Sequence, residues 1–246
     1  MLYMIGIGLA DAKDITVKGL EAVRKADRVF LEGYTSLLQC DVKELEKLYG
    51  KPVTILDRVA VEQRSEGIID SAKKLDVAFL VVGDVFGATT HTDFYLRAKD
   101  AGVDVTLIPN ASIINAIGVT GLDLYKFGRT TTIVFPEKSF APESFYDVIT
   151  ENLLRGLHTL CLLDIKADQK RYMTVPEAIE ILEGIEKKRG EDTLPAKMLG
   201  CARLTNKDQL VSYATKEELK KKDWGPPPHC LVVPGPLHVV EEEMLS

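Results

Sequence analysis

Short apolar runs alternate along the chain with segments in which apolar residues recur every three or four positions. Uninterrupted apolar runs are typical of buried strands, and the longer period is typical of helices that bury one face. Strands are expected at residues 2–7, 28–31, 77–82, 104–108, 131–134, 159–163, 197–202 and 230–233. Helices are expected at 16–25, 41–48, 62–73, 90–101, 113–118, 145–156, 175–188 and 216–220, with Thr16 and Thr174 as N-caps.

This alternation predicts an α/β protein of two lobes, each a mixed, mostly parallel sheet flanked by helices. The best place to divide the chain is near Pro109, where a strand ends in a Pro-Asn turn before the next helix begins. We therefore expect lobes at residues 1–110 and 111–246. A chain of 246 residues is long enough for two domains of ordinary size.

The composition argues against a nucleic acid or a membrane as the main partner. The formal net charge is −6 and the pI is near 5.4, whereas phosphate groups are bound by concentrated basic patches. The first residues do not resemble a signal peptide, and no later run reaches the roughly 18 to 20 apolar residues that span a bilayer. We expect a cytoplasmic protein, with the charge runs Lys220–Lys222 and Glu241–Glu243 on solvated surface.

The cysteines and histidines do not form a metal-binding pattern. His91, His158 and His238 have no metal-like spacing with one another or with a cysteine, so no metal is expected. Reduced, buried thiols are expected because no CxxC pair occurs among the four cysteines, Cys40, Cys161, Cys201 and Cys230.

A glycine turn, Gly6-Ile7-Gly8-Leu9, follows the first predicted strand. Glycines allow the backbone to approach a ligand closely, although a strand-end turn without a ligand explains the same residues. A dinucleotide fingerprint needs GxGxxG opening a helix, but Asp11 stands at the third glycine position. The sequence also lacks the GxxxxGK[ST], GxSxG and HExxH motifs, which argues against ATP hydrolysis, α/β-hydrolase chemistry and zinc proteolysis.

The loop Gly83-Asp84-Val85-Phe86-Gly87-Ala88-Thr89-Thr90-His91 is the strongest candidate for a binding site. It follows an apolar strand, and ligands bind at the carboxyl ends of strands in parallel sheets. Asp84 offers a carboxylate, although a loop cap that accepts bonds from neighbouring amides is the structural alternative. Thr89 and Thr90 offer hydroxyls, with an N-cap of the following helix as their alternative.

Two further junctions carry polar side chains at strand ends. In the segment 109–113, Ser112 can cap the next helix or present its hydroxyl and amide to a ligand. In the segment 226–231, three prolines precede His229 at the start of a strand, and their stiffness lowers the entropy cost of holding the imidazole. A histidine satisfied by backbone bonds is an equally good explanation of His229.

Taken together, these motifs resemble the diphthine synthase family, which has the tetrapyrrole-methylase fold. The similarity covers essentially the whole chain, and the segments GLHTLCLLDIKA and PPHCLVVPGPLH are far more specific than the glycine turn. The segments that carry it are GIGL at 6–9, YTSL at 34–37, GDVFGATTH at 83–91, NASIINAIGVTGL at 110–122, YKFGRTTTI at 125–133, GLHTLCLLDIKA at 156–167, YMT at 172–174 and PPHCLVVPGPLH at 227–238.

The resemblance implies a two-lobed, homodimeric enzyme that binds S-adenosylmethionine in a cleft between its lobes. One local departure is Val85, which replaces the proline of the family's usual GDP sequence, and the match around residue 204 is loose. The ligand contacts that the family implies are Leu9, Asp84, Gly87, Ser112, Ile113, Leu163, Leu204 and His229.

The same resemblance implies elongation factor 2 as the protein substrate. The family methylates the amino group of a 3-amino-3-carboxypropyl histidine, and the short chain favours three methyl additions. Because an α-amino group titrates near about 7.7 to 8.0, no strong base is required, and no catalytic residue is assigned. His91 or Asp164 could assist proton loss, with a helix-start cap and a strand-end turn residue as their structural alternatives.

Three other functions compete with this interpretation. A tetrapyrrole methyltransferase of the same fold is the nearest, and the DIKA and PPH segments argue against it. Val85, in place of the family's proline, is the only residue that favours a non-catalytic ligand-binding module. A nicotinamide-dependent oxidoreductase requires the dinucleotide fingerprint that the chain lacks.

Overall fold

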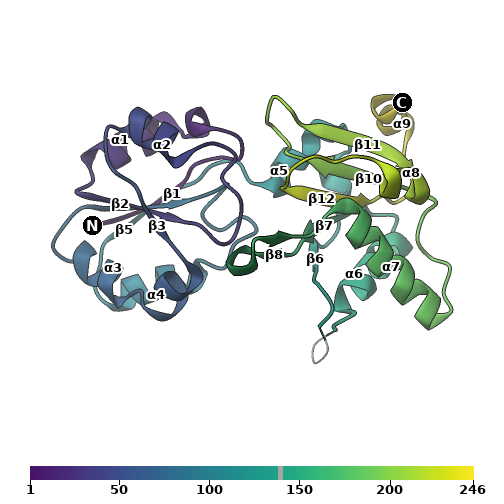
Figure 1. The fold of residues 1–246 in the computed structure, drawn as a ribbon, viewed down its shortest axis with the longest axis horizontal. Helices are drawn as coiled ribbons and strands as arrows, with labels where there is room; N and C mark the ends of the chain where they lie inside the picture. The colour runs from purple at the N-terminus through teal and green to yellow at the C-terminus, as the bar shows by residue number, and fades with distance from the viewer. Residues whose placement is uncertain (138–140) are drawn as a thin grey trace. The chain divides into compact units, whose positions relative to one another are not determined.

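The computed structural model describes residues 1–137 and 141–246, and the chain divides into two compact units (Figure 1). The first unit is Met1–Ala116 and the second is Ile117–Ser246. The boundary therefore follows the short helix α5 (Ile113–Ala116), which the sequence had placed at the beginning of the second lobe.

The first unit is built on a five-stranded sheet with the order β3-β2-β4-β1-β5, and every pairing in it is parallel. Helices α1 and α2 lie on one face of the sheet, and α3 and α4 on the other (Figure 1). The strands are β1 (Leu2–Gly6), β2 (Arg28–Glu32), β3 (Thr54–Leu56), β4 (Val77–Val81) and β5 (Val105–Ile108). The helices are α1 (Val17–Lys25), α2 (Val42–Tyr49), α3 (Glu66–Ala72) and α4 (Thr92–Asp100).

The central strands of this sheet explain its apolar runs. Every residue of β1 and β4 is buried, because helices cover both faces of a parallel sheet. Since all five strands run in the same direction, their carboxyl ends meet at one edge. The loops that leave this edge are the usual place for a ligand in such a sheet.

The second unit has a mixed sheet with the order β11-β10-β12-β7-β6. The prediction that it is mostly parallel was wrong: β6 and β7 are parallel, but β7, β12, β10 and β11 pair antiparallel. The connection from β10 to β11, residues 203–209, is too short for the crossover that a parallel pair needs. The strands are β6 (Thr131–Ile133), β7 (Thr159–Leu163), β10 (Lys197–Ala202), β11 (Leu210–Thr215) and β12 (His229–Val233).

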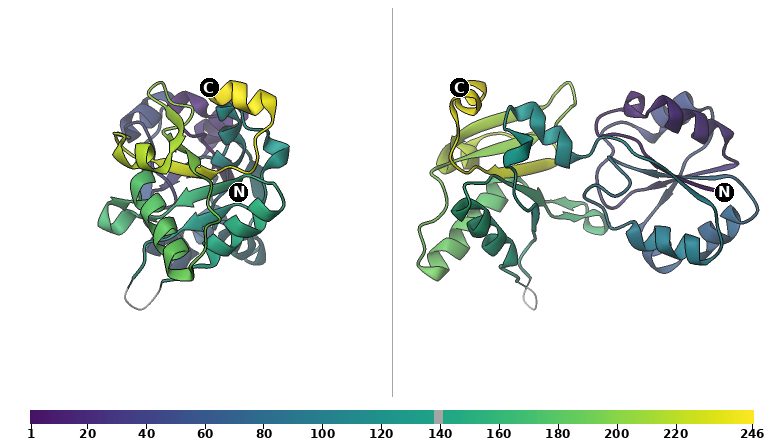
Figure 2. Two further views of the ribbon diagram at one scale, coloured as in Figure 1. Left: turned by 90° about the vertical axis from the view of Figure 1, so that its right-hand side faces the viewer. Right: turned by 180° about the vertical axis from the view of Figure 1, so that it is seen from behind.

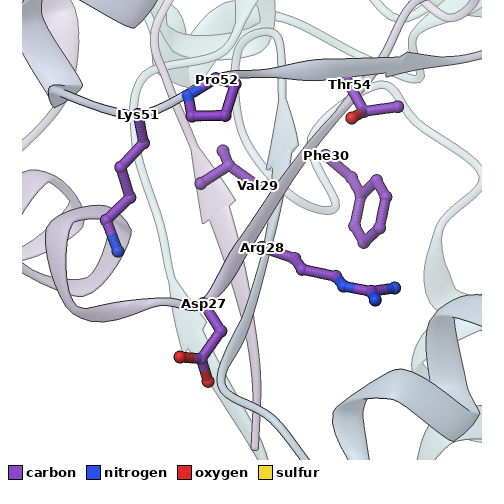
Figure 3. A pocket seen from close by; sticks show the side chains of 7 residues that line it. All are labelled: Asp27, Arg28, Val29, Phe30, Lys51, Pro52 and Thr54. Carbon is purple, nitrogen blue, oxygen red and sulfur yellow. The ribbon is translucent and has the colours of Figure 1, made fainter.

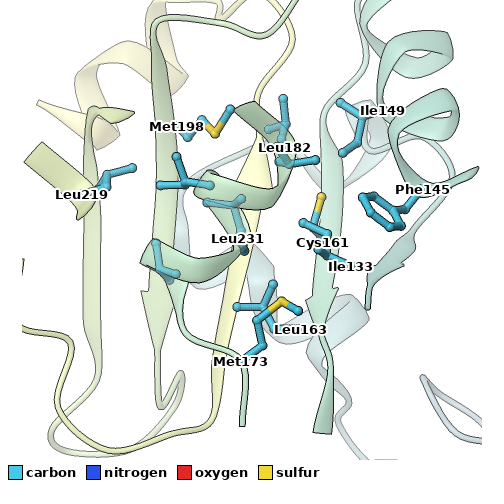
Figure 4. Close-up of a cluster of buried hydrophobic side chains, with 14 of the residues drawn as sticks. Ile133, Phe145, Ile149, Cys161, Leu163, Met173, Leu182, Met198, Leu219 and Leu231 are labelled. Carbon is cyan, nitrogen blue, oxygen red and sulfur yellow. The ribbon is translucent and has the colours of Figure 1, made fainter. Parts of the chain in front are cut away.

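The core of the second unit forms where helices α6 (Ser144–Leu154) and α7 (Val175–Arg189) pack on its sheet (Figure 4). Ile149, Leu182 and Leu231 come from three different elements and are each fully buried in this cluster. Helix α7 begins at the predicted cap, Thr174, which forms a reciprocal capping box with Glu177. The predicted cap Thr16 likewise accepts a bond from the amide of Gly19.

The remaining elements are short, and several were missed in the sequence. They include α5, the 3-10 helices η1 (Ala12–Asp14), η3 (Ile117–Thr120), η4 (Leu124–Lys126) and η5 (Ala167–Gln169), the π-helix η2 (Val59–Gln63), the hairpin β8 (Ile165–Lys166) with β9 (Arg171–Tyr172), and helices α8 (Lys216–Lys221) and α9 (Val239–Leu245). All four cysteines are free, and all except Cys40 are buried. No helix in residues 1–137 and 141–246 is both long and apolar enough to cross a membrane.

The C-terminal helix corrects the prediction for the second charge run. Glu241 of α9 is not solvated: its side chain is fully buried and accepts bonds from the His158 ring (2.8 Å) and the Lys126 ammonium (2.8 Å). The amides of Asp123 and His238 also donate to the Glu241 carboxylate. This carboxylate therefore fastens α9, the yellow helix at the C-terminus in Figure 2, to the η4 turn.

The charges in this network follow from burial. Burial alone would raise the pKa of Glu241, but the bonds from Lys126 and His158 outweigh it and lower the pKa to about 2. Burial also lowers the pKa of His158, although Glu241 opposes this shift. His158 Nδ1 accepts a bond from the Gly235 amide, so Nε2 carries the proton and donates to Glu241. The pair is a neutral imidazole and a carboxylate, with Lys126 as the counter-charge.

We expect Glu241→Gln to lower the free energy of unfolding of the second unit by about 2 kcal/mol, because charged hydrogen bonds are lost from a buried site. Trp224 is the single tryptophan and is buried in the second unit, so its fluorescence during guanidinium unfolding reports on this unit. The matched control is Glu242→Gln, since Glu242 is the exposed neighbour and its change should cost less than about 0.5 kcal/mol.

The same pair of proteins tests the pH dependence. The Glu241 contribution should be fully present above the ordinary glutamate pKa of about 4.3, and it should be lost as the pH falls through the folded pKa of about 2. The difference between wild type and Glu241→Gln should therefore shrink in acid. A difference that stays constant from neutral pH to pH values near the folded pKa would contradict this assignment.

Candidate functional site

Three loops meet at the carboxyl edge of the first sheet. They follow β1, β4 and β5, which are neighbours in the order β4-β1-β5. The predicted contacts Leu9, Asp84, Gly87 and Ser112 lie in these loops, and Ile113 is the first residue of α5, which follows the third loop. The structure therefore brings together side chains from positions that are far apart in the chain.

The first two loops are joined through glycines. Gly8 and Gly83 exchange two backbone hydrogen bonds, of 3.1 and 2.7 Å, and both have a positive φ. A Cβ atom on Gly6 would lie 2.6 Å from the carbonyl oxygen of Gly83, which is closer than a side chain can approach. The glycines of the GIGL and GDVFG segments are thus required for the backbones to lie this close.

Asp84 is the link between the loop after β4 and the loop after β5. Its Oδ1 accepts bonds from the amides of Phe86 and Gly87, both at 2.9 Å, and its Oδ2 accepts one from the amide of Asn110 at 3.0 Å. Burial raises the pKa of Asp84, but these amides and that of Val85 outweigh it and lower the pKa.

These bonds show that Asp84 caps the loop, which was the structural alternative for this residue. Its contact with a methyl donor stays a prediction. Thr89 also has a structural role, because its hydroxyl donates to the Val85 carbonyl at 2.6 Å rather than capping helix α4.

Asn110 is a residue of this site that sequence reasoning missed. Its side-chain amide donates to the carbonyls of Gly6 and Asp14, both at 3.0 Å, while its own backbone amide is held by Asp84. Asp14 in turn accepts bonds from the amides of Leu9 and Ala10. The Pro-Asn turn marked a strand end in the sequence, but only the fold shows that Asn110 bonds to the loop after β1.

Ser112 occupies the centre of the contact between the loops. Its side chain lies so close to Gly87 that a Cβ atom there would be 2.7 Å from both Ser112 Cβ and Oγ. The Ser112 hydroxyl accepts the amide of Ile114, and the Ser112 amide donates to Asn115 Oδ1. The predicted helix cap is therefore present, and the hydroxyl hydrogen is left to donate elsewhere. Ile113 is half-buried beside it.

In the second unit, the predicted residues lie at one edge of the mixed sheet. Ala202 at the end of β10 pairs with His229 at the start of β12, and Leu162 near the end of β7 pairs with Cys230. Leu163 and Leu204 each lie just beyond these pairs and are buried. The sheet therefore places Leu163, Leu204 and His229 at the ends of three adjacent strands.

His229 is held rigidly but keeps one free nitrogen. Arg203 supports the preceding loop through the carbonyls of Trp224 and Pro226, and its amide donates to the carbonyl of Pro228. The His229 Nε2 lies 3.2 Å from the Pro226 carbonyl, whereas Nδ1 is buried and has no hydrogen-bond partner among the described residues. Burial lowers the pKa of His229, so its ring is neutral at pH 7.

Each unit offers its own set of candidate contacts. In the first unit, close-packed glycine loops offer backbone surface and the Ser112 hydroxyl. In the second, buried leucines lie near an imidazole with an unpartnered nitrogen. Asp164, by contrast, has a structural role, since its carboxylate accepts the amide of Phe135 at 3.0 Å.

A cavity of about 280 Å³ at the opposite, amino edge of the first sheet is a poor candidate (Figure 3). It is lined by residues of β2 and the segment before β3, including Arg28, Lys51 and Pro52. Lys51 is bonded to the Ala26 carbonyl, and no lining residue has a buried, unpartnered side-chain atom in the described part of the chain. The described residues also contain no group of three or more side chains that could hold a metal ion.

Comparison with known proteins shows what family the chain resembles. The family model of the tetrapyrrole (corrin/porphyrin) methylases matches residues 1–220. The chain is 46% identical over 268 residues to the diphthine methyl ester synthase of Homo sapiens, covering 100% of this chain and 94% of the relative. It is 44% identical over 249 residues to the diphthine synthase of Methanococcus maripaludis, covering 100% and 98%.

A solved structure is also similar. A crystal structure of diphthine synthase superimposes with a TM-score of 0.90 at 38% identity, over 99% of this chain and 94% of that one. The similarity extends over both units, so it includes both groups of site residues.

We expect Gly87→Ala to weaken binding of S-adenosylmethionine at least tenfold, about 1.4 kcal/mol, because the added Cβ must displace Ser112 and with it the loop after β5. Isothermal titration calorimetry measures the affinity directly. Gly67→Ala is the matched control, since a Cβ atom at Gly67 meets no atom within 4 Å. Equal affinity of the two variants for S-adenosylmethionine would show that Gly87 does not belong to the donor site.

Proposed function

This chain belongs to the diphthine synthases of the tetrapyrrole (corrin/porphyrin) methylase family, and we propose that it methylates a 3-amino-3-carboxypropyl histidine on elongation factor 2. It is an S-adenosylmethionine-dependent methyltransferase of diphthamide biosynthesis. The observation that carries the proposal is the cluster of three loops fixed by Asp84, which joins the family's motifs at the edge of a parallel sheet. Its protein substrate would place it in the cytoplasm.

Residues of both units are proposed to hold the donor. In the first unit these are Leu9, Asp84, Gly87, Ser112 and Ile113, with Asp84 acting through the loop that it organises. In the second they are Leu163, Leu204 and His229. S-adenosylmethionine, when bound, would supply the methyl group of its sulfonium, and the sulfur would keep the electron pair of the broken carbon–sulfur bond.

The chain's own contribution is proposed to be orientation of the amine toward the donor. Orientation of the two reactants can lower the barrier by about 7 to 11 kcal/mol. An α-amino group with a pKa of about 7.7 to 8.0 is partly neutral at pH 7, so its nitrogen has a free electron pair without an enzymatic base. The amine proton is released to water. His229, with its lowered pKa, is proposed to act in binding rather than in proton removal.

We propose three methyl additions, all to the amino nitrogen. A second candidate is a fourth addition, to the carboxylate, because the human relative is named a diphthine methyl ester synthase. The archaeal relative, named a diphthine synthase, is almost equally similar. The names of both relatives favour a diphthine-type acceptor over a tetrapyrrole.

The function is tested by mass spectrometry of elongation factor 2 that carries the unmethylated precursor, after incubation with this protein and S-adenosylmethionine. We expect three successive methyl masses on the modified histidine. A fourth mass that is removed by mild alkali identifies an ester and supports the second candidate. Donor binding without any added mass would contradict the proposed acceptor and favour a non-catalytic module.

A homodimer is proposed as the assembly, and an apolar surface on the second unit supports it. Helix α9 and the η3–η4 segment pack together, since a Cβ atom on Gly121 would lie 2.5 Å from that of Met244. Tyr125 is 99% exposed, although most large apolar side chains of the unit are buried. Contiguous exposed apolar surface is typical of an interface. The other exposed members are Val119, Leu124, Val239, Val240 and Met244.

We expect Tyr125→Asp combined with Val240→Asp to convert the dimer to a monomer, because two charges would be buried at the interface. Sedimentation velocity measures the mass of each form. Leu154→Asp is the control, since Leu154 is 88% exposed but lies on helix α6. A dimer that survives the double substitution would place the interface elsewhere.

A further inference from the structure

A second cavity, of about 300 Å³, opens at the carboxyl edge of the first sheet, next to the loops already described. It lies where β2 and β4 end, which are neighbours in the sheet order. All its lining residues belong to the first unit: Tyr34, Val61, Glu62, Thr90, His91, Asp93, Phe94 and Arg97. The donor contacts considered above do not include any of them.

Three side chains lining this cavity have a buried polar atom without a hydrogen-bond partner among the described residues: the Tyr34 hydroxyl, His91 Nε2 and Arg97 Nε. Arg97 Nε is ion-paired with Asp93, whereas the other two atoms belong to Tyr34 and His91, which are only 4% and 1% exposed. Thr90 is near enough to affect the pKa of Tyr34 but not in hydrogen-bond geometry. A buried polar atom left unpaired costs about 1 to 3 kcal/mol, so two beside one cavity point to a ligand.

The two side chains are held in fixed positions. The His91 ring meets the rings of Tyr34 and Phe79 edge to face, with centroids 6.0 and 5.4 Å apart. The buried Glu32 carboxylate accepts bonds from the amides of Tyr34 and Thr35 and fixes the turn after β2. A hydrogen-bonding site built on rigid strand ends loses little entropy when it binds.

The charges around the cavity suit a zwitterion. Glu62 lines it with a partly exposed carboxylate. The Arg97 guanidinium donates to Ser65 Oγ (2.5 Å) and the Val61 carbonyl (3.1 Å), and it has further N–H groups. Arg97 Nε also lies 2.8 Å from Asp93 Oδ2, without hydrogen-bond geometry. The lining thus carries two carboxylates, Glu62 and Asp93, and one guanidinium, Arg97.

His91 can accept a hydrogen bond from an amine. Burial lowers the pKa of His91 to about 4, so the imidazole is neutral at pH 7 and one nitrogen has a free lone pair. With this pKa, His91 is a poor base for an amine of pKa about 7.7 to 8.0. Its role is therefore to orient the amine rather than to remove its proton.

We propose that this cavity binds the α-amino acid end of the methyl acceptor, with the amine against Tyr34, His91 and Glu62 and the carboxylate toward Arg97. The inference rests on the proposed function and gives its acceptor group a binding site. The loop at residues 83–91 supports it, because Asp84 and Gly87 near its start belong to the donor loops, while Thr90 and His91 at its end line the cavity.

The first test is direct binding of L-2-aminobutyrate, a free amino acid with the same amine and carboxylate, to the whole protein. We expect millimolar binding that shifts the nitrogen resonances of the His91 ring, and Tyr34→Phe should weaken it. The matched control is Tyr49→Phe: Tyr49 also has a buried, unpartnered hydroxyl, but it lies in the core of the first unit and not beside the cavity. No shift in the wild-type protein would overturn the proposal.

The second test is methyl transfer to elongation factor 2 bearing the precursor. Tyr34→Phe should lower kcat/KM for this acceptor about tenfold, equivalent to about 1.4 kcal/mol, without changing the affinity for S-adenosylmethionine. Tyr49→Phe should leave both unchanged. Full activity of Tyr34→Phe would overturn the cavity proposal, although the proposed function would stand. An inactive wild-type protein that still binds L-2-aminobutyrate would instead contradict the proposed function.

Discussion

The carboxylate of Asp84 is the constraint on which the candidate site depends. It accepts three backbone amides from two loops, and through Asn110 the same network extends to the loop after β1. Several amides that point at a single carboxylate keep it ionised despite partial burial, as the lowered pKa shows. The loops after β4 and β5 are thus held together by one half-buried charge.

The three buried histidines differ in their hydrogen-bond partners, and this difference decides which of them is structural. Burial lowers the pKa of His91, His158 and His229 alike. Both ring nitrogens of His158 are bonded, to Glu241 and to the Gly235 amide, so this histidine is structural. His91 and His229 each keep a buried nitrogen without a partner among the described residues, so their rings remain able to bond to a ligand.

The elements that the sequence predicted well are those with strong apolar patterns. The strands at Thr159–Leu163 and Lys197–Ala202 were predicted to the residue, because they are almost wholly buried. The edge strands β3 and β11 were missed because their residues are exposed or half-buried and form no apolar run. Helix α9 was missed because its stabilising contact is a buried glutamate, and a run of glutamates is usually solvated.

The sequence by itself determined the α/β class, the family and the segments from which the candidate site is built, since apolar periodicity and local motifs are properties of neighbouring residues. Only the tertiary structure decided the antiparallel pairing in the second sheet, the link from Asp84 to Asn110 and the burial of Glu241 against His158. It also placed Tyr34 beside His91. These contacts join residues that are distant in the chain, so the partner of each side chain is fixed by packing rather than by local sequence.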